Sequence, residues 1–255
     1  MSSSNDSTAA SEVFTPLVPR PVSGRVFTSR RCVRLSDADA TGRLRLDAVA
    51  RYLQDVAVDD VAETGWGADE HIWLVRRTLI EQIRPFSVAE TVTLTTWSSG
   101  AGTVAASRRT TLAGDSGGSI EAESIWAHLG RDLRPQRLGE RFFAVYGEST
   151  VGRRISHKLD LAGPPDGAAR ERWPLRSADI DVLGHVNNAA YWEAVEDAAK
   201  SASFNPAGPL VAVLEFRQPI DLEDEVELVS SREAGGFRLA LSVVGTPKAI
   251  ALVRS

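Results

Sequence analysis

The stretch Asp179-Ile-Asp-Val-Leu-Gly-His-Val186 repeats the pattern of an earlier stretch, Asp37-Ala-Asp-Ala-Thr-Gly-Arg-Leu44, at a constant offset of 142 residues. A second match follows in the same order, because residues 85–94 correspond to residues 219–228 at a constant offset of 134. Self-similarity of this kind is the sequence signature of a duplicated structural unit. The two matches therefore predict two copies of one fold, and the smaller second offset gives the first copy eight more residues between its matching stretches.

Each copy is predicted to contain a strand, the acidic loop, a helix and several antiparallel strands. Residues 46–63 place apolar side chains at helical spacing, and Gly65 lies just beyond them. Later runs alternate apolar and polar residues, which is typical of strands with one buried face. The predicted helices are residues 46–63 and 188–203, and the predicted strands are residues 25–35, 73–85, 88–97, 104–112, 119–130, 172–176, 210–219, 223–232, 237–244 and 249–253.

These elements predict the fold class and the domain organisation. A long helix and a curved antiparallel sheet can bury each other's apolar faces, so each copy is predicted to be an α+β unit of two layers. Edge-to-edge pairing of two such units would remove an exposed sheet edge, which makes the fused pair a pseudo-dimer. We expect a disordered or loosely draped tail at residues 1–23, a first unit at 24–144, a linker at 145–169 and a second unit at 170–255.

The composition is that of a globular protein with neither a membrane span nor general affinity for nucleic acid. Hydrophobic residues make up 43% of the chain and charged residues 25%, and no apolar run is long enough to cross a bilayer. The net charge of −5 argues against nucleic-acid binding. Because the chain has one cysteine and a Ser-rich start unlike a secretory signal, we expect a cytoplasmic protein.

The two copies diverge at the loop that enters the helix. The second copy places Asp181, His185, Asn187 and Asn188 within eight residues, whereas the first copy has no imidazole or carboxamide there. Backbone N–H groups at a helix start lack partners within the helix and can polarise a carbonyl. An acidic residue beside them can attack that carbonyl or activate a water. The pattern therefore suits acyl transfer.

Each of these residues also has a purely structural interpretation. Asp181 could brace the turn or cap the helix, His185 could be a satisfied structural histidine, and both asparagines could be ordinary capping residues. A symmetric structural role would be expected in both copies, so the presence of the whole set in only one copy favours function.

The remaining polar features predict no metal site and no other cofactor. The four histidines do not occur in a ligand-spaced motif, and the sequence has neither a phosphate loop nor a G-x-S-x-G elbow. Residues 131–158 hold seven basic and three acidic residues, Arg131 and Arg134 among them, so this segment carries a charge of +4. It is either a solvated linker or a landing site for phosphopantetheine, CoA phosphates or an acidic carrier protein.

Residues 179–191 resemble the acyl-ACP thioesterases of plants and bacteria, which share a D-x-D-x-x-x-H-V-N-N-x-x-Y pattern there. The resemblance extends over about residues 26–228 and includes Arg51-Tyr-Leu-Gln-Asp55, residues 72–77, residues 96–100 and Ser124-Ile-Trp126. It implies a tandem double hotdog fold that hydrolyses fatty acyl thioesters of acyl carrier protein. In this family the first hotdog chiefly shapes the acyl pocket and the second supplies the catalytic groups.

The resemblance also implies roles for individual residues. By position, the catalytic aspartate of the family falls on Asp181 and its histidine on His185, and the helix-start amide used by related single-hotdog thioesterases would be that of Asn188. The residues expected to contact substrate are Gly184, Asn187, Arg131 and Arg134.

Two departures from the family pattern change the expected mechanism. The plant enzymes have an asparagine two residues after the aspartate, where this chain has Leu183. They also have a Glu-Cys pair where this chain has Pro219-Ile220. A simpler mechanism built on Asp181 and a helix-end amide is therefore expected, and Glu215 is one candidate replacement because strand alternation puts it on the face of position 219.

We therefore expect a thioesterase of fatty acid biosynthesis that acts on acyl-ACP or acyl-CoA, as a monomeric pseudo-dimer or a homodimer. One alternative is a non-catalytic module that binds acyl thioesters or lipids, which Leu183 and Pro219 favour. The other is a dehydratase or hydratase of acyl thioesters, which would need a second acid/base group set for the β-carbon.

Overall fold

The computed structural model describes residue 14, residues 16–65 and residues 72–255, and its two copies share one order of elements. The first copy contains β1 (Phe27–Cys32), α2 (Leu46–Glu63), β2 (Ile72–Arg84), β3 (Thr91–Ala101), β4 (Ala105–Gly114) and β5 (Ser119–Leu129). The second contains β6 (Ala169–Trp173), α4 (Ala190–Ser201), β7 (Leu210–Phe216), β8 (Val226–Glu233), β9 (Gly236–Val243) and β10 (Thr246–Arg254). The internal repeat therefore corresponds to two copies of one topology.

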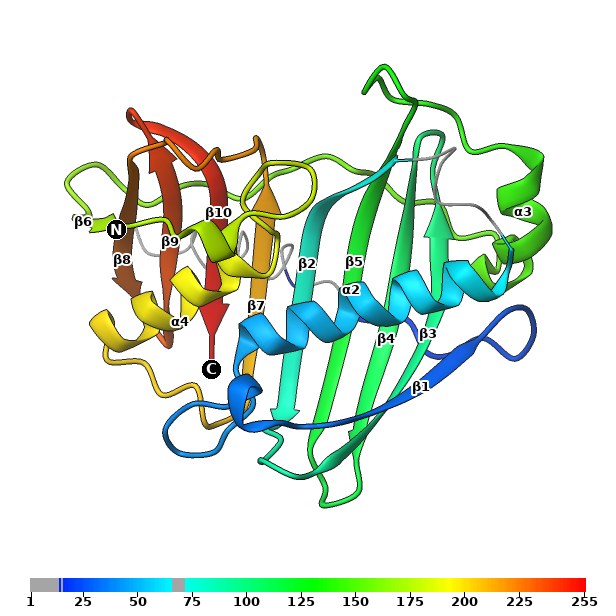
Figure 1. Cartoon of the computed structure of the whole chain (residues 1–255), viewed down its shortest axis with the longest axis horizontal. Helices are drawn as coiled ribbons and strands as arrows, with labels where there is room; N and C mark the ends of the chain where they lie inside the picture. Colours follow the sequence, from blue (N-terminus) through cyan, green and yellow to red (C-terminus); the bar gives the residue numbers. More distant parts are fainter. Residues whose placement is uncertain (1–13, 15, 66–71) are drawn as a thin grey trace, which may run out of the picture.

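The strands form one sheet of ten strands, in the order β1-β3-β4-β5-β2-β7-β10-β9-β8-β6. The order within the second copy mirrors that of the first, and the copies join through antiparallel pairing of β2 with β7, from Arg77 opposite Glu215 to Gln82 opposite Leu210. Both long helices cross the same face of this sheet and contact each other (Figure 1). This arrangement confirms the predicted α+β pseudo-dimer.

Within each copy, the loop before the helix contacts the second repeated stretch, and the contact is the same in both copies. The Leu44 N–H donates to the Phe86 carbonyl over 2.9 Å, and the Val186 N–H donates to the Ile220 carbonyl over 2.9 Å. Leu44 and Val186 are related by the offset of 142, whereas Phe86 and Ile220 are related by the offset of 134. In the second copy this bond holds the loop before α4 against the loop after β7.

The core lies between the two helices and the sheet, and the opposite face of the sheet has its own apolar cluster. Leu214 and Phe216 of β7 belong to the helix side, whereas Val213 belongs to the opposite cluster. Strand alternation puts Glu215 on that opposite face as well. Its buried carboxylate accepts the N–H groups of Asp160 over 2.9 Å and Leu161 over 3.1 Å. The suggestion that Glu215 replaces the missing family glutamate is therefore wrong.

Several elements differ from the predictions, and strand ends shift by up to four residues, as in β3, which spans residues 91–101 rather than 88–97. The helix α3 (Glu140–Tyr146) is not among the predicted helices, and its buried residues Phe142 and Tyr146 lie one helical turn apart. The first strand of the second copy, β6, lies at residues 169–173 rather than 172–176. The helix α4 begins at Ala190 rather than at residue 188. The helix α2 has the predicted bounds.

Only residue 14 and residues 16–23 of the predicted tail lie among the described residues. Residues 1–13 and 15 lie outside the described residues, but the Val18 carbonyl accepts a hydrogen bond from Arg109 of β4 over 3.0 Å. Leu17 packs against the apolar cluster on the face of the sheet away from the helices. Among the described helices, none combines the length and the apolar character that crossing a membrane requires.

Candidate active site

The loop before each helix has the same frame in both copies. Asp37 and Asp179 each accept a backbone N–H from three residues earlier, over 3.0 Å and 2.8 Å respectively. Gly42 and Gly184 have φ angles of +86° and +84°, a left-handed conformation that glycine adopts without steric cost. The aspartate and the glycine of the repeat are therefore explained by the shape of the loop, and Gly184 has this structural role whether or not it contacts substrate.

Asp181 braces the turn with one of its two carboxylate oxygens. Its Oδ1 accepts the Leu183 N–H over 2.8 Å, as the Oδ1 of Asp39 accepts the Thr41 N–H over 2.8 Å. The difference lies in the second oxygen. The Oδ2 of Asp39 forms an ion pair with Arg43 over 2.9 Å, whereas the described residues provide no such partner for the Oδ2 of Asp181. The structural interpretation thus accounts for one oxygen and leaves the other available for chemistry.

His185 is held by a carboxylate that the sequence did not indicate. Its Nδ1 lies 2.6 Å from the Oδ1 of Asp221, in the loop after β7, and the two side chains are 48% and 57% exposed. An imidazole that donates its Nδ1 proton to a carboxylate presents Nε2 as a proton acceptor. The first copy has Arg43 and Ser87 at the two corresponding positions. A histidine–aspartate pair therefore exists in the second copy and not in the first.

The buried phenol of Tyr191 lies close to this group. Burial is the main reason that the pKa of Tyr191 is raised above its ordinary value, and the nearby carboxylates of Asp181 and Asp221 raise it further. The phenol, with its pKa raised above the ordinary value, therefore stays neutral around neutral pH. It can donate a proton in a hydrogen bond but does not serve as a base.

The two asparagines form the turn that starts α4. The side-chain oxygen of Asn187 accepts the Ala189 N–H over 2.8 Å, and the backbone carbonyl of Asn187 accepts the Ala190 N–H over 2.9 Å. This side-chain turn explains why the helix begins two residues later than predicted. The Asn188 N–H lies in the turn itself, and none of the described residues accepts a hydrogen bond from it.

The corresponding amide in the first copy does have a partner, and that partner is an anion. The N–H of Leu46 donates to the Oε1 of Glu196 over 2.8 Å, across from α4 to the start of α2. Arg43 donates to both oxygens of the same carboxylate, over 3.0 Å and 2.7 Å. Burial opposes the charge on Arg43, but Glu196 and Asp39 hold its pKa above the ordinary value. A negative oxygen is thus bound at the helix start of the first copy.

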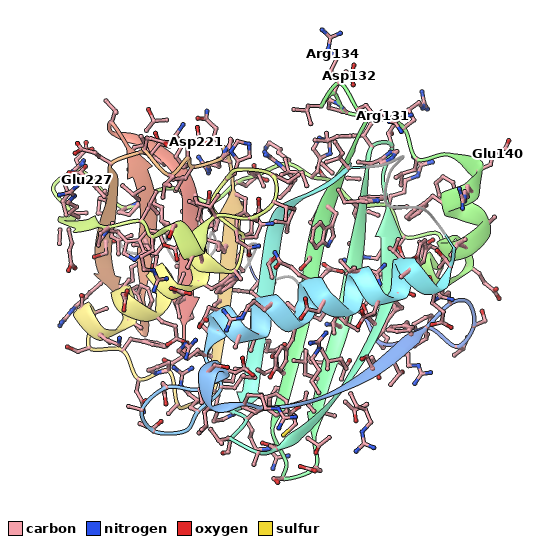
Figure 2. All side chains as sticks on the ribbon, in the orientation of Figure 1. Arg131, Asp132, Arg134, Glu140, Asp221 and Glu227 are labelled. Atoms are coloured by element: carbon pink, nitrogen blue, oxygen red, sulfur yellow. The ribbon has the colours of Figure 1, made fainter. Side chains whose placement is uncertain are left out.

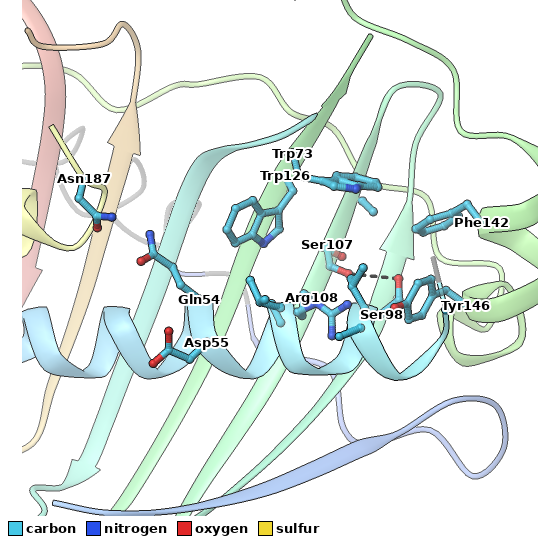
Figure 3. A pocket seen from close by; sticks show the side chains of 16 residues that line it. Gln54, Asp55, Trp73, Ser98, Ser107, Arg108, Trp126, Phe142, Tyr146 and Asn187 are labelled. Atoms are coloured by element: carbon cyan, nitrogen blue, oxygen red, sulfur yellow. Dashed lines mark hydrogen bonds between the residues drawn. The ribbon is translucent and has the colours of Figure 1, made fainter. Parts of the chain in front are cut away.

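A mostly apolar cavity of about 730 Å³ lies between α2 and the sheet of the first copy (Figure 3). Trp73, Trp126 and Phe142 contribute its aromatic walls, and Asn187 of the second copy closes one end. A smaller cavity beside it is lined by Asn188. Of the predicted residues, the two asparagines therefore face the cavities, whereas Asp181 and His185 lie on the more exposed part of the same loop and are not among the described lining residues.

The other predicted positions lie elsewhere. Arg131 and Arg134 belong to a loop that protrudes beyond the end of the sheet, and Arg134 is 86% exposed (Figure 2). Neither residue lines a described cavity. Leu183 is exposed at the tip of the turn. The part of the chain that the structure describes contains no cluster of side chains suited to a metal ion.

A duplicated helix-on-sheet unit, with its two copies fused through one continuous sheet, defines a double hotdog fold. The family model named acyl-ACP thioesterase N-terminal domain matches residues 24–146, and the model named acyl-ACP thioesterase C-terminal domain matches residues 164–248. The chain belongs to the acyl-ACP thioesterase family and is a thioester hydrolase.

Individual proteins are similar to this chain in sequence or in structure. An uncharacterized protein of Mycobacterium tuberculosis is 34% identical over 244 residues, which are 95% of this chain and 97% of that protein. The 12:0-ACP thioesterase from Umbellularia californica has a similar structure, with a TM-score of 0.74, 18% identity, and coverage of 91% of this chain and 98% of that one. An acyl-ACP thioesterase from Bacteroides thetaiotaomicron gives a TM-score of 0.74 at 18% identity, covering 90% and 97%. These likenesses confirm the double hotdog fold.

Proposed function

We propose that the chain hydrolyses fatty acyl thioesters of acyl carrier protein at the start of α4, in the second copy. The observation that supports this site is the bond between Leu46 and Glu196, because it shows what the same loop does with a negative oxygen in the first copy. In the second copy the equivalent amide, that of Asn188, has no described partner. It is therefore free to polarise a thioester carbonyl and to stabilise the oxyanion that forms on attack.

The acyl chain would occupy the cavity of about 730 Å³ in the first copy. With the chain there, the carbonyl carbon reaches the end of the cavity at Asn187, next to the small cavity that Asn188 lines, and the sulfur and its pantetheine arm lead outwards past the exposed part of the loop. Asp181 and His185 lie on that part. Their exposure suits a substrate delivered by a bulky carrier, since the carrier itself remains outside the pocket.

The groups on the loop can carry out both halves of the reaction. Asp181 acts as the base that activates water or as the nucleophile itself, and the Asn188 N–H stabilises the oxyanion of the tetrahedral intermediate. The C–S bond then breaks, and the departing thiolate takes a proton from water, or from His185 after its Nε2 has accepted one from solvent. In the nucleophilic route water then hydrolyses the anhydride between the acyl group and Asp181, which frees the acid and restores the carboxylate. Asp221 keeps the His185 ring in one orientation and one tautomer.

The first experiment is thiol release from acyl-ACP and acyl-CoA substrates of increasing chain length. Asp39→Asn is the matched control for Asp181→Asn, because both aspartates brace the same turn with one oxygen. We expect Asp181→Asn to lose turnover and Asp39→Asn to keep it in the folded protein. Equal activity of wild type and Asp181→Asn on every substrate would refute the site, and tight acyl-thioester binding without any turnover would instead indicate a non-catalytic binding protein.

A single turnover in H₂¹⁸O separates the two roles of Asp181. If Asp181 activates water, the fatty acid released in the first turnover carries ¹⁸O. If Asp181 is the nucleophile and water attacks the acyl-enzyme anhydride at the Asp181 carbon, the first-turnover product carries only ¹⁶O, so an unlabelled product identifies the nucleophilic route. Mass spectrometry of the released acid reads the difference directly.

The carrier is the second part of the proposal. The family assignment favours acyl carrier protein, and the loop with Arg131 and Arg134 offers exposed positive charge for an acidic partner. Arg134 pairs with Asp132 of the same loop over 3.9 Å, and its 86% exposure leaves the charge within reach of a partner. We expect charge reversal at Arg131 and Arg134 to raise KM for acyl-ACP more than for acyl-CoA. An equal effect on both substrates would contradict carrier recognition by this loop.

We place the reaction in the cytoplasm, which keeps thiols reduced and suits a chain with a single cysteine. Fractionation of cells that produce the protein tests this location.

A further inference from the structure

The relation between the two copies extends from the loops into the helices. The offset of 142 that pairs Leu46 with Asn188 also pairs Gln54 of α2 with Glu196 of α4. The two helices contact each other, and each carries one of these residues. Glu196 of α4 reaches the start of α2, where its carboxylate accepts the Leu46 N–H over 2.8 Å. Two-fold symmetry then directs Gln54 of α2 towards the start of α4.

Gln54 does lie at that place. It lines the large cavity together with Asn187 and the small cavity together with Asn188. Figure 3 shows its carboxamide projecting from α2 on the side of Asn187. The side chain is half-buried, and none of the described residues is recorded in a hydrogen bond with its carboxamide. A polar group of a mostly apolar cavity, at the end where the thioester would lie, is thus available to a ligand.

We propose that Gln54 of the first copy is the second donor to the thioester carbonyl oxygen, beside the Asn188 N–H. This inference rests on the proposed function and assigns a catalytic residue to the copy that otherwise forms the acyl pocket. A carboxamide offers two N–H donors without a charge. Two donors converging on one oxygen form an oxyanion hole, and each contributes where negative charge develops.

The amide at position 54 also explains why this helix start remains open. A carboxylate there would accept the Asn188 N–H as Glu196 accepts the Leu46 N–H, and it would repel the developing oxyanion. The helix start of the first copy, with Arg43 beside it, receives the Glu196 carboxylate from α4 and is filled. The helix start of the second copy, with His185 in place of Arg43, meets the neutral Gln54 carboxamide from α2 at a small cavity. Glu196 therefore fills the start of α2, whereas Gln54 at the corresponding position leaves the start of α4 open to a ligand.

The experiment compares wild type with Gln54→Ala and Gln54→Glu, and uses Asp59→Asn as the control on the same helix. Asp59 is exposed and is not among the residues that line the cavities. With acyl-ACP as substrate, Gln54→Ala should lower kcat by about 10²- to 10³-fold, as loss of one oxyanion donor does, and change KM little. Gln54→Glu should lower kcat further, and Asp59→Asn should match wild type.

A second readout does not depend on turnover. In Gln54→Glu the new carboxylate should accept the Asn188 N–H, so the amide proton resonance of Asn188 should move downfield in the ¹H–¹⁵N spectrum and exchange more slowly with solvent. A Gln54→Ala variant with kcat within twofold of wild type would overturn the role in catalysis. If wild type hydrolyses no thioester, the proposed function fails by itself, and the Asn188 resonance in Gln54→Glu still tests whether residue 54 lies at the start of α4. An unchanged resonance would overturn that position of residue 54, and a downfield shift would support it.

Discussion

Replacing Glu196 by alanine should destabilise the chain severely, because its carboxylate connects the two copies. The side chains of Arg43 and Glu196 are only 5% and 9% exposed. Removing one partner of a buried ion pair costs about 3–5 kcal/mol, because the other charge is left without compensation. The Leu46 N–H also loses its acceptor. Arg43 keeps its contact with the partly exposed Asp39, which limits the loss. We therefore expect the free energy of unfolding to fall by about 3 kcal/mol, the lower end of that range.

Urea unfolding followed by tryptophan fluorescence measures this change, since the chain has six tryptophans. The control is Asp197→Ala, the next residue along α4, whose ion pair with Lys200 is exposed and should be worth at most about 1 kcal/mol. Glu196→Gln should lie between the two variants, because its carboxamide oxygen can still accept the Leu46 N–H. A loss below about 1 kcal/mol for Glu196→Ala would refute the argument, since leaving a buried guanidinium without its carboxylate should destabilise the folded state by more than that.

Three further predictions follow from single positions. Gly184→Ala and Gly42→Ala should each lower the free energy of unfolding by about 1–2 kcal/mol, because both residues have a positive φ that a Cβ disfavours. The added methyl group meets no closer side-chain atom than one of Val88 at 4.0 Å, so backbone strain accounts for the loss. Equal stability of the variants and wild type in urea would contradict this. Asp221→Asn should lower kcat by about 10²-fold with little change in KM, since His185 loses the carboxylate that orients it; a change in KM alone would count against that role. Ala106→Phe should shift kcat/KM towards shorter acyl chains because Ala106 lines the cavity, and an unchanged chain-length profile would show that the acyl group lies elsewhere.

The repeat predicted the architecture because it consists of residues whose effect is local. A glycine at positive φ and an aspartate that accepts backbone N–H groups shape the same turn in both copies, whatever surrounds them. The apolar spacing of residues 46–63 is likewise sufficient to predict α2. The short helix α3 was missed because seven residues give too few turns for a periodic pattern, and packing in the cavity wall decides its conformation.

The candidate site was only partly predictable, because its members come from segments distant in the chain. Asp181, His185, Asn187 and Asn188 occur in one stretch and were found together. Asp221 is 36 residues from His185 and meets it only because the Val186 N–H bonds to the Ile220 carbonyl. The available signal was the second repeated stretch, which aligns Ile220 with Phe86 and so places Asp221 beside the loop. The interpretation of Glu215 as a site residue was wrong for a different reason. Strand alternation shows which residues share a face, but it does not show which of the two faces meets the site.

The single sheet that joins the copies through β2 and β7 has a consequence for stoichiometry. In a dimer of identical subunits, a substitution that fills one helix start with a carboxylate would fill both and leave no receptive position. Within one chain, each helix start can change independently, so one of them is closed by a salt bridge from the other half while the second retains its open amide. Each polypeptide should therefore take up one acyl chain and release one thiol per catalytic cycle, and a pre-steady-state titration should saturate at one equivalent rather than two.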